Sequence, residues 1–305
     1  MKAAIDIGTN SVRLLIGDWK DGSFKAIRRE LTITRLGQGV DNSGKLSPDA
    51  MSKTVRAIEN FAQILEQENP EQVHVIATSA VRDAINRKEF ISLIKERTGL
   101  TVRVLTGEEE ARLSFKGAVE TLYPKGKNIG LLGVLDIGGG STELMFGDSS
   151  GAIAAINSVQ VGAVRMTERY ISSNPIKKEE LLNFEKAART ELRKLVKGFD
   201  QSIELIGVGG TITTAAAMEQ RMFNYSAEQV TGVVLRDENL QLLYHQLAAM
   251  SLEERLNIPG LQRGREDVIV AGLGILIIMM DLFNCHELTV SDGDLLLGVL
   301  LEKTI

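Results

Sequence analysis

The chain of 305 residues is poor in the residues that most often build metal and redox centres. Its one cysteine, Cys285, excludes a disulfide within the chain and is typical of a reducing compartment. The three histidines, His74, His245 and His286, are scattered and form neither a Cys/His zinc pattern nor an obvious Ser-His-Asp set. The sequence therefore argues against a zinc domain, a disulfide-stabilised secreted domain and a histidine-dependent hydrolase.

The chain also lacks an excess of basic residues and a long apolar run. Its formal net charge is −5, so we expect no general nucleic-acid surface. The longest apolar run, Val268–Met280, is shorter than the ~20 residues that span a bilayer and indicates a buried helix. The first predicted strand begins almost at the N-terminus, which leaves no room for a signal peptide. We therefore expect a cytoplasmic protein of about two domains that binds neither nucleic acid nor membranes.

What the chain does contain is a glycine-rich hairpin over residues 134–146. An apolar run that includes Asp136 breaks at the loop, and a second apolar run resumes after Glu143. The loop consists of Gly138, Gly139, Gly140 and Ser141. Such loops let backbone N–H groups approach an anion, and a carboxylate on each side suits a hard cation such as Mg²⁺. Taken alone, the pattern is equally consistent with an ordinary hairpin whose aspartate favours the turn.

The same pattern occurs a second time near the N-terminus. Residues 6–18 align without a gap to residues 136–148 and are identical to them at seven of thirteen positions. The loop of this copy, which follows Asp6, contains Thr9, Asn10 and Ser11. A repeat about 130 residues apart has the size of a domain. The two copies therefore predict two related domains, each offering a loop to a shared cleft.

Strand and helix patterns alternate along the chain and predict an α/β fold. Residues 2–36 predict an antiparallel meander, and the strands expected over 73–77 and 100–105 enclose a helix, which indicates a parallel βαβ unit. Tyr123–Lys127 is typical of an interdomain linker.

The second half repeats this alternation. We expect another meander with separate strands over 152–156 and 158–161. Asn174 with Pro175 is expected to cap a long helix that ends at Gly198.

Two helix starts carry polar groups of functional interest. The helix after the strand 100–105 opens with Glu108, Glu109 and Glu110. Three acids in a first turn complement the helix dipole, but Glu110 also follows a strand end, where α/β folds place reacting groups.

The second helix start follows the strand expected over 203–208. It consists of Gly209, Gly210 and Thr211. A strand, two glycines and a helix N-terminus favour a phosphate or nucleotide site, and a plain tight turn remains the alternative. Neither the P-loop pattern nor the dinucleotide-binding glycine spacing is present.

Together these segments resemble the exopolyphosphatase and guanosine pentaphosphate phosphatase family (Ppx/GppA), which belongs to the fold superfamily of actin, heat-shock chaperones and sugar kinases. The segments that carry the resemblance are, in order, Asp6–Ser11, Arg35–Val40, Ala77–Ala84, Gly107–Arg112, Asp136–Glu143, Gly207–Thr211 and Ser291–Gly293. The resemblance implies an α/β fold of two ribonuclease-H-like (actin-like ATPase) domains that face across a central cleft. The implied domains are residues 1–124 with 292–305, so that the last helix returns to the first domain, and residues 125–291.

The resemblance also implies a role for each matched residue. Glu110 takes the place of the family's catalytic glutamate, and Arg82 that of its phosphate-contacting arginine. Asp136 and Glu143 match the metal-binding acids, for which Mg²⁺ is the expected ion, and Asp6 matches their counterpart in the first domain. The implied phosphate loops are Gly138, Gly139, Gly140 and Ser141 in one domain and Thr9, Asn10 and Ser11 in the other.

The implied activity is that of an exopolyphosphatase, which releases terminal orthophosphate from inorganic polyphosphate. Guanosine pentaphosphate (pppGpp) 5′-phosphohydrolase is the nearest alternative. A small-molecule kinase of the same superfamily, with a nucleotide at Gly207–Thr211, and a non-catalytic polyphosphate or alarmone sensor also remain open. The chain stops at Ile305 without the C-terminal helical domains of longer family members, and the resemblance implies a homodimer.

Overall fold

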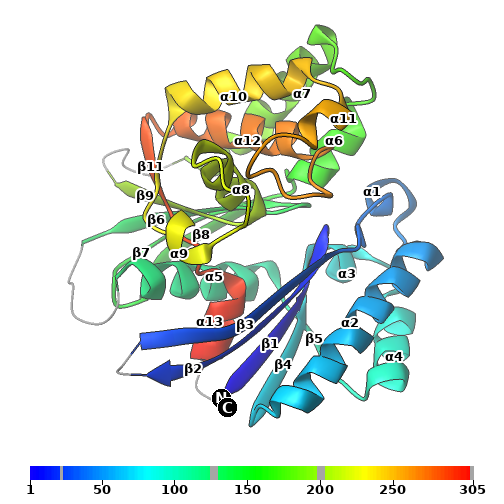
Figure 1. Cartoon of the computed structure of the whole chain (residues 1–305). Helices are drawn as coiled ribbons and strands as arrows, with labels where there is room; N and C mark the ends of the chain where they lie inside the picture. The colour runs from blue at the N-terminus through cyan, green and yellow to red at the C-terminus, as the bar shows by residue number, and fades with distance from the viewer. Residues whose placement is uncertain (21–22, 124–129, 198–202, 303–305) are drawn as a thin grey trace. The chain divides into compact units, whose positions relative to one another are not determined.

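The computed structural model of the chain describes residues 1–20, 23–123, 130–197 and 203–302 (Figure 1). The chain divides into two compact units, Met1–Gly117 with Leu295–Ile305 and Ala118–Asp294. The domain limits predicted from the sequence lie close to these borders and stay a proposal. Most of the predicted linker, Pro124–Lys127, lies outside the described residues.

The first unit is built on a mixed sheet with the strand order β3-β2-β1-β4-β5. Its strands are β1 (Lys2–Ile7), β2 (Ser11–Lys20), β3 (Ser23–Ile33), β4 (Gln72–Ala77) and β5 (Val102–Val104). The first three pair antiparallel, whereas β4 is parallel to β1 and β5 is parallel to β4. The predicted meander and the βαβ unit are therefore confirmed, although β5 is shorter than the predicted strand 100–105.

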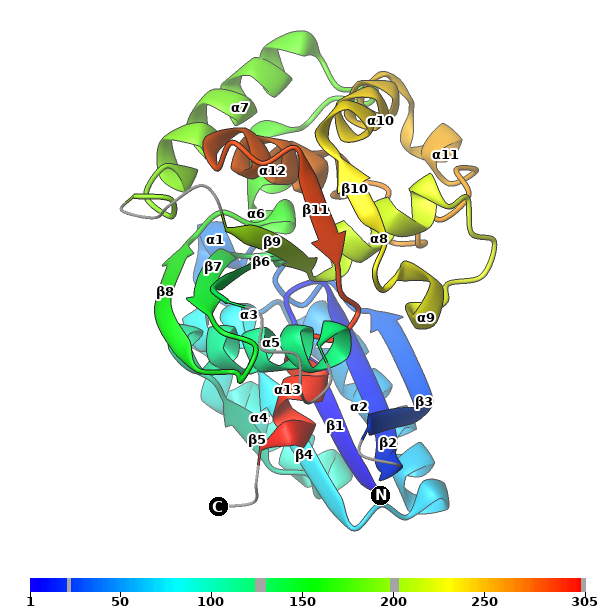
Figure 2. The same ribbon diagram turned by 90° about the vertical axis from the view of Figure 1, so that its left-hand side faces the viewer.

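Alternate residues of β1 point to opposite faces of this sheet, and different helices cover each face (Figure 1, Figure 2). Ala3, Ile5 and Ile7 belong to the core beneath α2 (Pro48–Glu68) and α4 (Arg87–Thr98). Ala4, on the other face, belongs to a core shared with α13 (Leu295–Leu301). The remaining helices of this part of the chain are α1 (Val40–Ser43), α3 (Ser79–Asp83) and α5 (Gly107–Leu122).

The sheet of the second unit repeats this plan, with the strand order β10-β11-β9-β6-β7-β8. Its strands are β6 (Leu132–Ile137), β7 (Thr142–Gly147), β8 (Ile153–Val159), β9 (Glu204–Val208), β10 (Val234–Arg236) and β11 (Glu287–Val290). An antiparallel meander, β6 to β8, is followed by β9 and β11, which continue the sheet in the parallel sense, and β10 adds an antiparallel edge. The shared plan confirms the predicted α/β class with two ribonuclease-H-like domains.

One strand of the second meander differs from the prediction. β8 is continuous where the sequence predicted two strands separated by Asn157. Asn157 pairs in register with Leu144, and its side-chain amide donates to the carbonyl oxygen of Leu195 at 2.9 Å. The asparagine therefore satisfies its polar side chain without breaking the strand.

The helices of the second unit pack mainly around α12 (Ile269–Leu282), which is almost fully buried, as its apolar sequence predicted (Figure 2). The others are α6 (Ala163–Tyr170), α7 (Lys178–Leu192), α8 (Gly210–Glu219), α9 (Ala227–Val230), α10 (Asp237–Ala249) and α11 (Leu252–Arg255). Among the described residues, no helix has both the length and the apolar character that crossing a bilayer requires.

The predicted start of α7 is wrong. The helix begins at Lys178, and Asn174 caps a different element, because its Oδ1 accepts a hydrogen bond from the backbone N–H of Leu252 at the start of α11. The partner of this asparagine is distant in sequence, so local pattern could not reveal it. The helix ends at Leu192, and the predicted end, Gly198, lies outside the described residues.

Gly298→Ala should destabilise the chain, because an added Cβ would lie 1.9 Å from the carbonyl oxygen of Leu113 and α13 would have to move away from α5. We expect the free energy of unfolding to fall by about 1–3 kcal/mol in urea denaturation. Gly107→Ala is the control, because no atom lies within 4 Å of its added Cβ. Equal stability of the two variants would contradict this close packing.

Candidate active site

The two sequence repeats form the same hairpin. In the first unit the N–H of Gly8 donates to the carbonyl oxygen of Ser11 at 3.0 Å, and Gly138 donates to Ser141 at the same distance in the second. The second strand of each hairpin also shifts in register against the strand that follows it, at the equivalent glycines Gly17 and Gly147. The repeat seen in the sequence is therefore a repeat of backbone structure.

The side chains that face each other across the two hairpins differ. Asp6 pairs with Arg13, whose Nε and Nη2 donate to Asp6 Oδ2 at 3.1 and 2.7 Å. Asp136 pairs in the same way with Glu143, so both carboxylates lie on one face of their sheet. Glu143 is buried, and its Oε1 accepts a hydrogen bond from Ser158 Oγ at 2.8 Å. The first hairpin thus holds a neutralised acid, and the second holds two acids.

The loop of the first hairpin is closed by the segment after β3. The carbonyl oxygen of Thr9 accepts from Gly37 N–H at 2.8 Å, and that of Asn10 accepts from Thr34 and Arg35 N–H at 3.1 and 2.9 Å. Arg35 makes this contact in the left-handed backbone region, with φ at 52°. The segment Arg35–Val40, whose sequence is typical of a glycine-rich connecting loop, therefore helps to fix the predicted phosphate loop.

The glycine loop of the second hairpin is held by α6, a helix that the sequence did not predict. The carbonyl oxygen of Gly138 accepts from Ala163 N–H at 2.9 Å, and that of Gly139 accepts from the first turn of α6. Arg165 Nε donates to the carbonyl oxygen of Gly140 at 2.8 Å. With these carbonyl oxygens engaged by α6, the groups that the loop can offer an anion are its N–H groups.

The start of α8 lies directly beside Asp136. Gly209 precedes the helix with φ at +89°, and a Cβ added there would lie 2.6 Å from Asp136 Oδ1. The parallel pairing of β6 with β9 produces this contact, because Asp136 and Val208 are in register. The structure therefore brings together two predicted sites that are far apart in the sequence, the metal acid and the glycines of residues 209–210.

The side chain of Thr211, a predicted phosphate-binding residue, faces away from this turn. It is buried against α12, where a Cβ added at Gly272 would lie 2.6 Å from Thr211 Oγ1. The N–H groups at the helix start carry the positive end of the helix dipole, which suits a phosphate oxygen.

Arg265 was missed in the sequence and lies at the same helix start. A Cβ added at Gly210 would lie 2.2 Å from Arg265 Nη2, so the guanidinium rests on the glycine backbone. Arg265 Nε donates to Gln262 Oε1 at 2.9 Å, which orients the fork. We call Gly209, Gly210 and Arg265 the anion corner, because it joins a helix N-terminus to a fixed cation.

Arg82 and Glu110, for which the family resemblance implied separate roles, meet in the first unit. Arg82 follows β4 in α3, and Glu110 follows β5 in α5. Arg82 Nη1 donates to Glu110 Oε2 at 2.7 Å and to the carbonyl oxygen of Leu105 at 3.0 Å. Both side chains are mostly buried, so a charge-assisted hydrogen bond holds the carboxylate in a fixed position.

The three glutamates at the start of α5 have different environments. Glu108 is exposed, whereas Glu109 closes a capping box in which its Oε2 accepts from Thr106 N–H at 2.8 Å and Thr106 Oγ1 accepts from Glu109 N–H at 3.1 Å. This backbone hydrogen bond and that of Arg103 lower the pKa of Glu109 to about 2. Glu109 therefore has a structural role, and Glu110 is the one paired with Arg82.

The two acids of the second hairpin fit a Mg²⁺ site that has few protein ligands. Among the residues that the structure describes, no group of three or more His, Cys, Asp or Glu side chains could hold a metal ion. Mg²⁺ commonly takes one or two carboxylates and completes its coordination with water and substrate phosphates. Asp136 and Glu143 fit this pattern. Asp6 is the weakest of the three predicted ligands, because Arg13 already neutralises its charge.

Comparisons with known proteins agree on one family. The Ppx/GppA phosphatase family matches residues 15–304. Exopolyphosphatase 2 of Mycobacterium tuberculosis is 34% identical over 317 residues, which cover 98% of this chain and 97% of that protein. The bifunctional 3-dehydroquinate synthase/phosphatase of Fusobacterium nucleatum is 33% identical over 322 residues, which cover 99% of this chain and 46% of that protein.

Solved structures give the same result. The Ppx/GppA family member of Aquifex aeolicus is 34% identical with a TM-score of 0.81, over 98% of this chain and 95% of that one. An exopolyphosphatase from Cytophaga hutchinsonii is 27% identical with a TM-score of 0.88, over 98% of this chain and 96% of that one.

Glu109→Gln should lower stability without affecting the site chemistry. We expect a loss of about 1 kcal/mol in the free energy of unfolding at pH 7, because the cap loses its charge. The lowered pKa contributes stability above pH 4.5, and this contribution disappears as the pH falls towards 2. The difference between Glu109→Gln and the wild type should therefore shrink over that range in urea denaturation. Exposed Glu108→Gln is the matched control, and a difference independent of pH would contradict the capping role.

Proposed function

Since the chain belongs to the Ppx/GppA phosphatase family, we propose that it is an exopolyphosphatase that hydrolyses the terminal phosphoanhydride bonds of inorganic polyphosphate and releases orthophosphate. Guanosine pentaphosphate is the alternative substrate, in which the same type of bond is broken. We propose the cytoplasm as the location and a homodimer as the assembly.

The pairing of Arg82 with Glu110 is the observation that carries this proposal. Hydrolysis of a phosphoanhydride needs an oriented water, a group that accepts its proton and positive charge around the phosphoryl oxygens. Glu110 is a carboxylate fixed beside a guanidinium, which supplies the second and third requirements at one place. A covalent enzyme intermediate is not needed, so the scarcity of cysteine and histidine is no obstacle.

In the proposed reaction the oxygen of the water forms a bond to the terminal phosphorus while the bridging P–O bond breaks. The proton of the water passes to the carboxylate of Glu110. The shortened polyphosphate leaves with the bridging oxygen and its electron pair. Arg82 donates to the phosphoryl oxygens during this step, and the guanidinium is then shared between the substrate and Glu110.

Phosphate binding is assigned to backbone N–H groups and arginines. The proposed groups are the loop Thr9, Asn10 and Ser11, the loop Gly138, Gly139, Gly140 and Ser141, and the turn Gly209, Gly210 and Thr211. Arg265 adds a fixed cation at the last of these. Asp136 and Glu143 would hold Mg²⁺, with Asp6 in a supporting role, and the ion when bound neutralises charge on the phosphoryl oxygens.

Phosphate release without an acceptor tests this function. We expect orthophosphate from polyphosphate with Mg²⁺ alone, whereas a kinase should require an acceptor and a sensor should bind without turnover. Long polyphosphate, short polyphosphate, guanosine pentaphosphate and ATP, compared at equal concentration of phosphoanhydride bonds, identify the preferred substrate. No release from any of the four would overturn the proposal.

Glu110→Gln should lower kcat by about 10²–10⁴-fold, because the shape is kept and the proton acceptor is lost. The KM for polyphosphate should change little, since the arginines and the loops remain. Glu108→Gln, which alters an exposed acid two residues away, is the control and should retain its rate. A Glu110→Gln rate within about threefold of the wild type, or ~0.7 kcal/mol in the barrier, would remove Glu110 from the mechanism.

Asp136→Ala and Glu143→Ala should raise the Mg²⁺ concentration needed for half-maximal activity, because each removes an oxygen ligand. Direct calorimetric titration with Mg²⁺ provides a readout that does not depend on turnover. Asp6→Asn should shift this titration less, since the carboxylate of Asp6 is bound by Arg13. Unchanged titrations for both Asp136→Ala and Glu143→Ala would contradict the metal assignment.

A further inference from the structure

The anion corner depends on a segment that has no helix or strand of its own. Residues 256–265, which we call the strap, connect α11 to the turn before α12 and run along α8. At one point a Cβ added to Gly260 would lie 2.2 Å from the carbonyl oxygen of Ala217, and at the other Arg265 rests on Gly210. These two contacts lie about 10 Å apart along the axis of α8.

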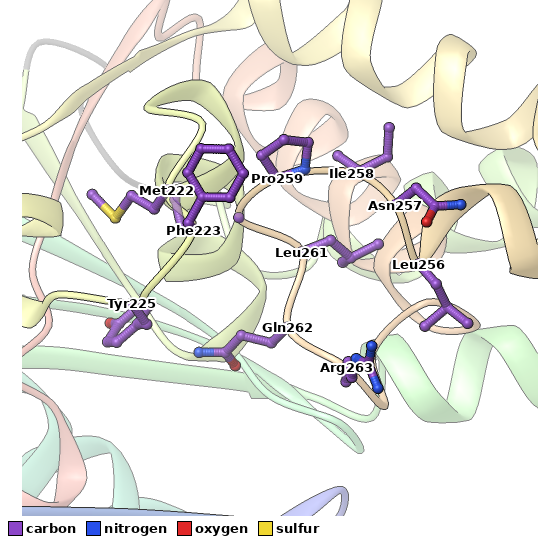
Figure 3. A pocket seen from close by; sticks show the side chains of 12 residues that line it. Met222, Phe223, Tyr225, Leu256, Asn257, Ile258, Pro259, Leu261, Gln262 and Arg263 are labelled. Atoms are coloured by element: carbon purple, nitrogen blue, oxygen red, sulfur yellow. The ribbon is translucent and has the colours of Figure 1, made fainter.

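The middle of the strap packs on the core through Leu261, which is buried, and Ile258, which is partly buried, and it also lines a pocket. Figure 3 shows a pocket of about 500 Å³ between the strap and the segment after α8, with Phe223 and Tyr225 on its far side. Phe223 is 91% exposed, so it covers little of the strap. Arg265 lies beyond the buried Leu261, at the end of the strap, where its carbonyl oxygen accepts from Ile269 N–H at 2.9 Å. Groups that hold this end therefore bear directly on the position of Arg265.

Arg255 contacts both ends of the strap through its guanidinium. It lies immediately before the strap and is only 2% exposed. Its Nε donates to the carbonyl oxygen of Leu247 near the end of α10 at 2.8 Å, and its Nη1 donates to the carbonyl oxygen of Glu266 at 2.9 Å. Glu266 is the neighbour of Arg265, so one guanidinium ties both ends of the strap to α10.

The environment of Arg255 is unusual for an arginine. Burial lowers its pKa, and the nearby charge of Asp267 opposes this shift. A buried cation is costly unless its donors are satisfied, and here the acceptors are backbone carbonyl oxygens, one in the last turn of α10 and one in the turn before α12. The carboxylate of Glu266 adds to the same arrangement, because its Oε2 accepts from Gly264 N–H at 2.6 Å.

We propose that Arg255 is a positioning residue that holds the strap closed, so that Arg265 stays on Gly210 and the anion corner is formed before the substrate arrives. This proposal rests on the proposed function only for the role of Arg265 as a phosphate-binding cation. Preorganisation of this kind raises affinity, because no ordering of the loop is required on binding.

Arg255→Met keeps the apolar stem of the side chain and removes both donors. It should raise the KM for polyphosphate and the calorimetric Kd for inorganic tripolyphosphate about tenfold, with kcat within about threefold. Arg255→Lys should restore part of this loss, because an ammonium can still donate to one of the two carbonyl oxygens. Unchanged KM and Kd in a folded Arg255→Met protein would overturn the proposal.

The decisive measurement is a double-mutant cycle with Arg265→Ala. If Arg255 acts through Arg265, Arg255→Met should weaken tripolyphosphate binding less than twofold further in the Arg265→Ala background. If the two substitutions raise the Kd for tripolyphosphate independently, so that their factors multiply in the double variant, Arg255 does not act through Arg265 and the proposal is overturned. Both single variants are compared by urea denaturation, so that loss of folding is recognised.

Gln262→Ala is a second variant that avoids the buried site. It removes the acceptor of Arg265 Nε on the strap and should weaken tripolyphosphate binding, again without further effect when Arg265 is alanine. If Gln262→Ala weakens tripolyphosphate binding equally in the Arg265→Ala background, the strap does not act on the anion corner through Arg265. Because the cycle is read by calorimetry, an absence of phosphate release would overturn the proposed reaction and leave the positioning proposal to be decided by binding.

Discussion

Close approach of neighbouring groups to glycine backbone is the constraint on which the candidate site of the second unit depends. Gly162 packs on Gly139, Gly209 packs on Asp136 and Gly210 packs under Arg265. A Cβ added at any of these glycines would lie less than 3 Å from the nearest atom. These contacts bring the hairpin loop, the start of α8 and the strap to one place. A side chain at any of the three positions would separate the groups that are proposed to bind phosphate.

The repeated hairpin shows how one backbone can serve two chemistries. Both copies keep the turn hydrogen bond and the register shift, which are properties of the glycines. They differ at the residue opposite the aspartate, which is Arg13 in the first unit and Glu143 in the second. An arginine neutralises its acid, whereas a second carboxylate favours a cation. The difference between a neutralised hairpin and the hairpin proposed to bind a metal therefore follows from one position of the pattern.

Much of the fold could be predicted from the sequence, because strands, glycine turns and helix starts are local patterns. The meanders, the βαβ unit and the buried α12 were visible in local patterns alone, whereas the contact of Arg82 with Glu110 was not foreseen. What could not be predicted depends on distant partners. Arg265 reaches Gly210 from a segment without periodicity, and Asn174 caps α11 across 78 residues. The capping box of Thr106 with Glu109 was a local signal, and recognising it separates Glu109 from Glu110.

Arginines near the predicted phosphate-binding segments of each unit bear on how a chain of net charge −5 could bind the proposed polyanionic substrate. Arg82, Arg165 and Arg265 are each held by an oxygen of the protein before any ligand is present, through Glu110, Gly140 and Gln262 respectively. A guanidinium fixed in this way loses little conformational freedom when it binds a phosphate. The overall charge governs long-range attraction, which salt screens within about 10 Å, whereas the local orientation of these donors acts at contact distance. A few fixed cations beside glycine loops can therefore bind phosphate on an acidic protein.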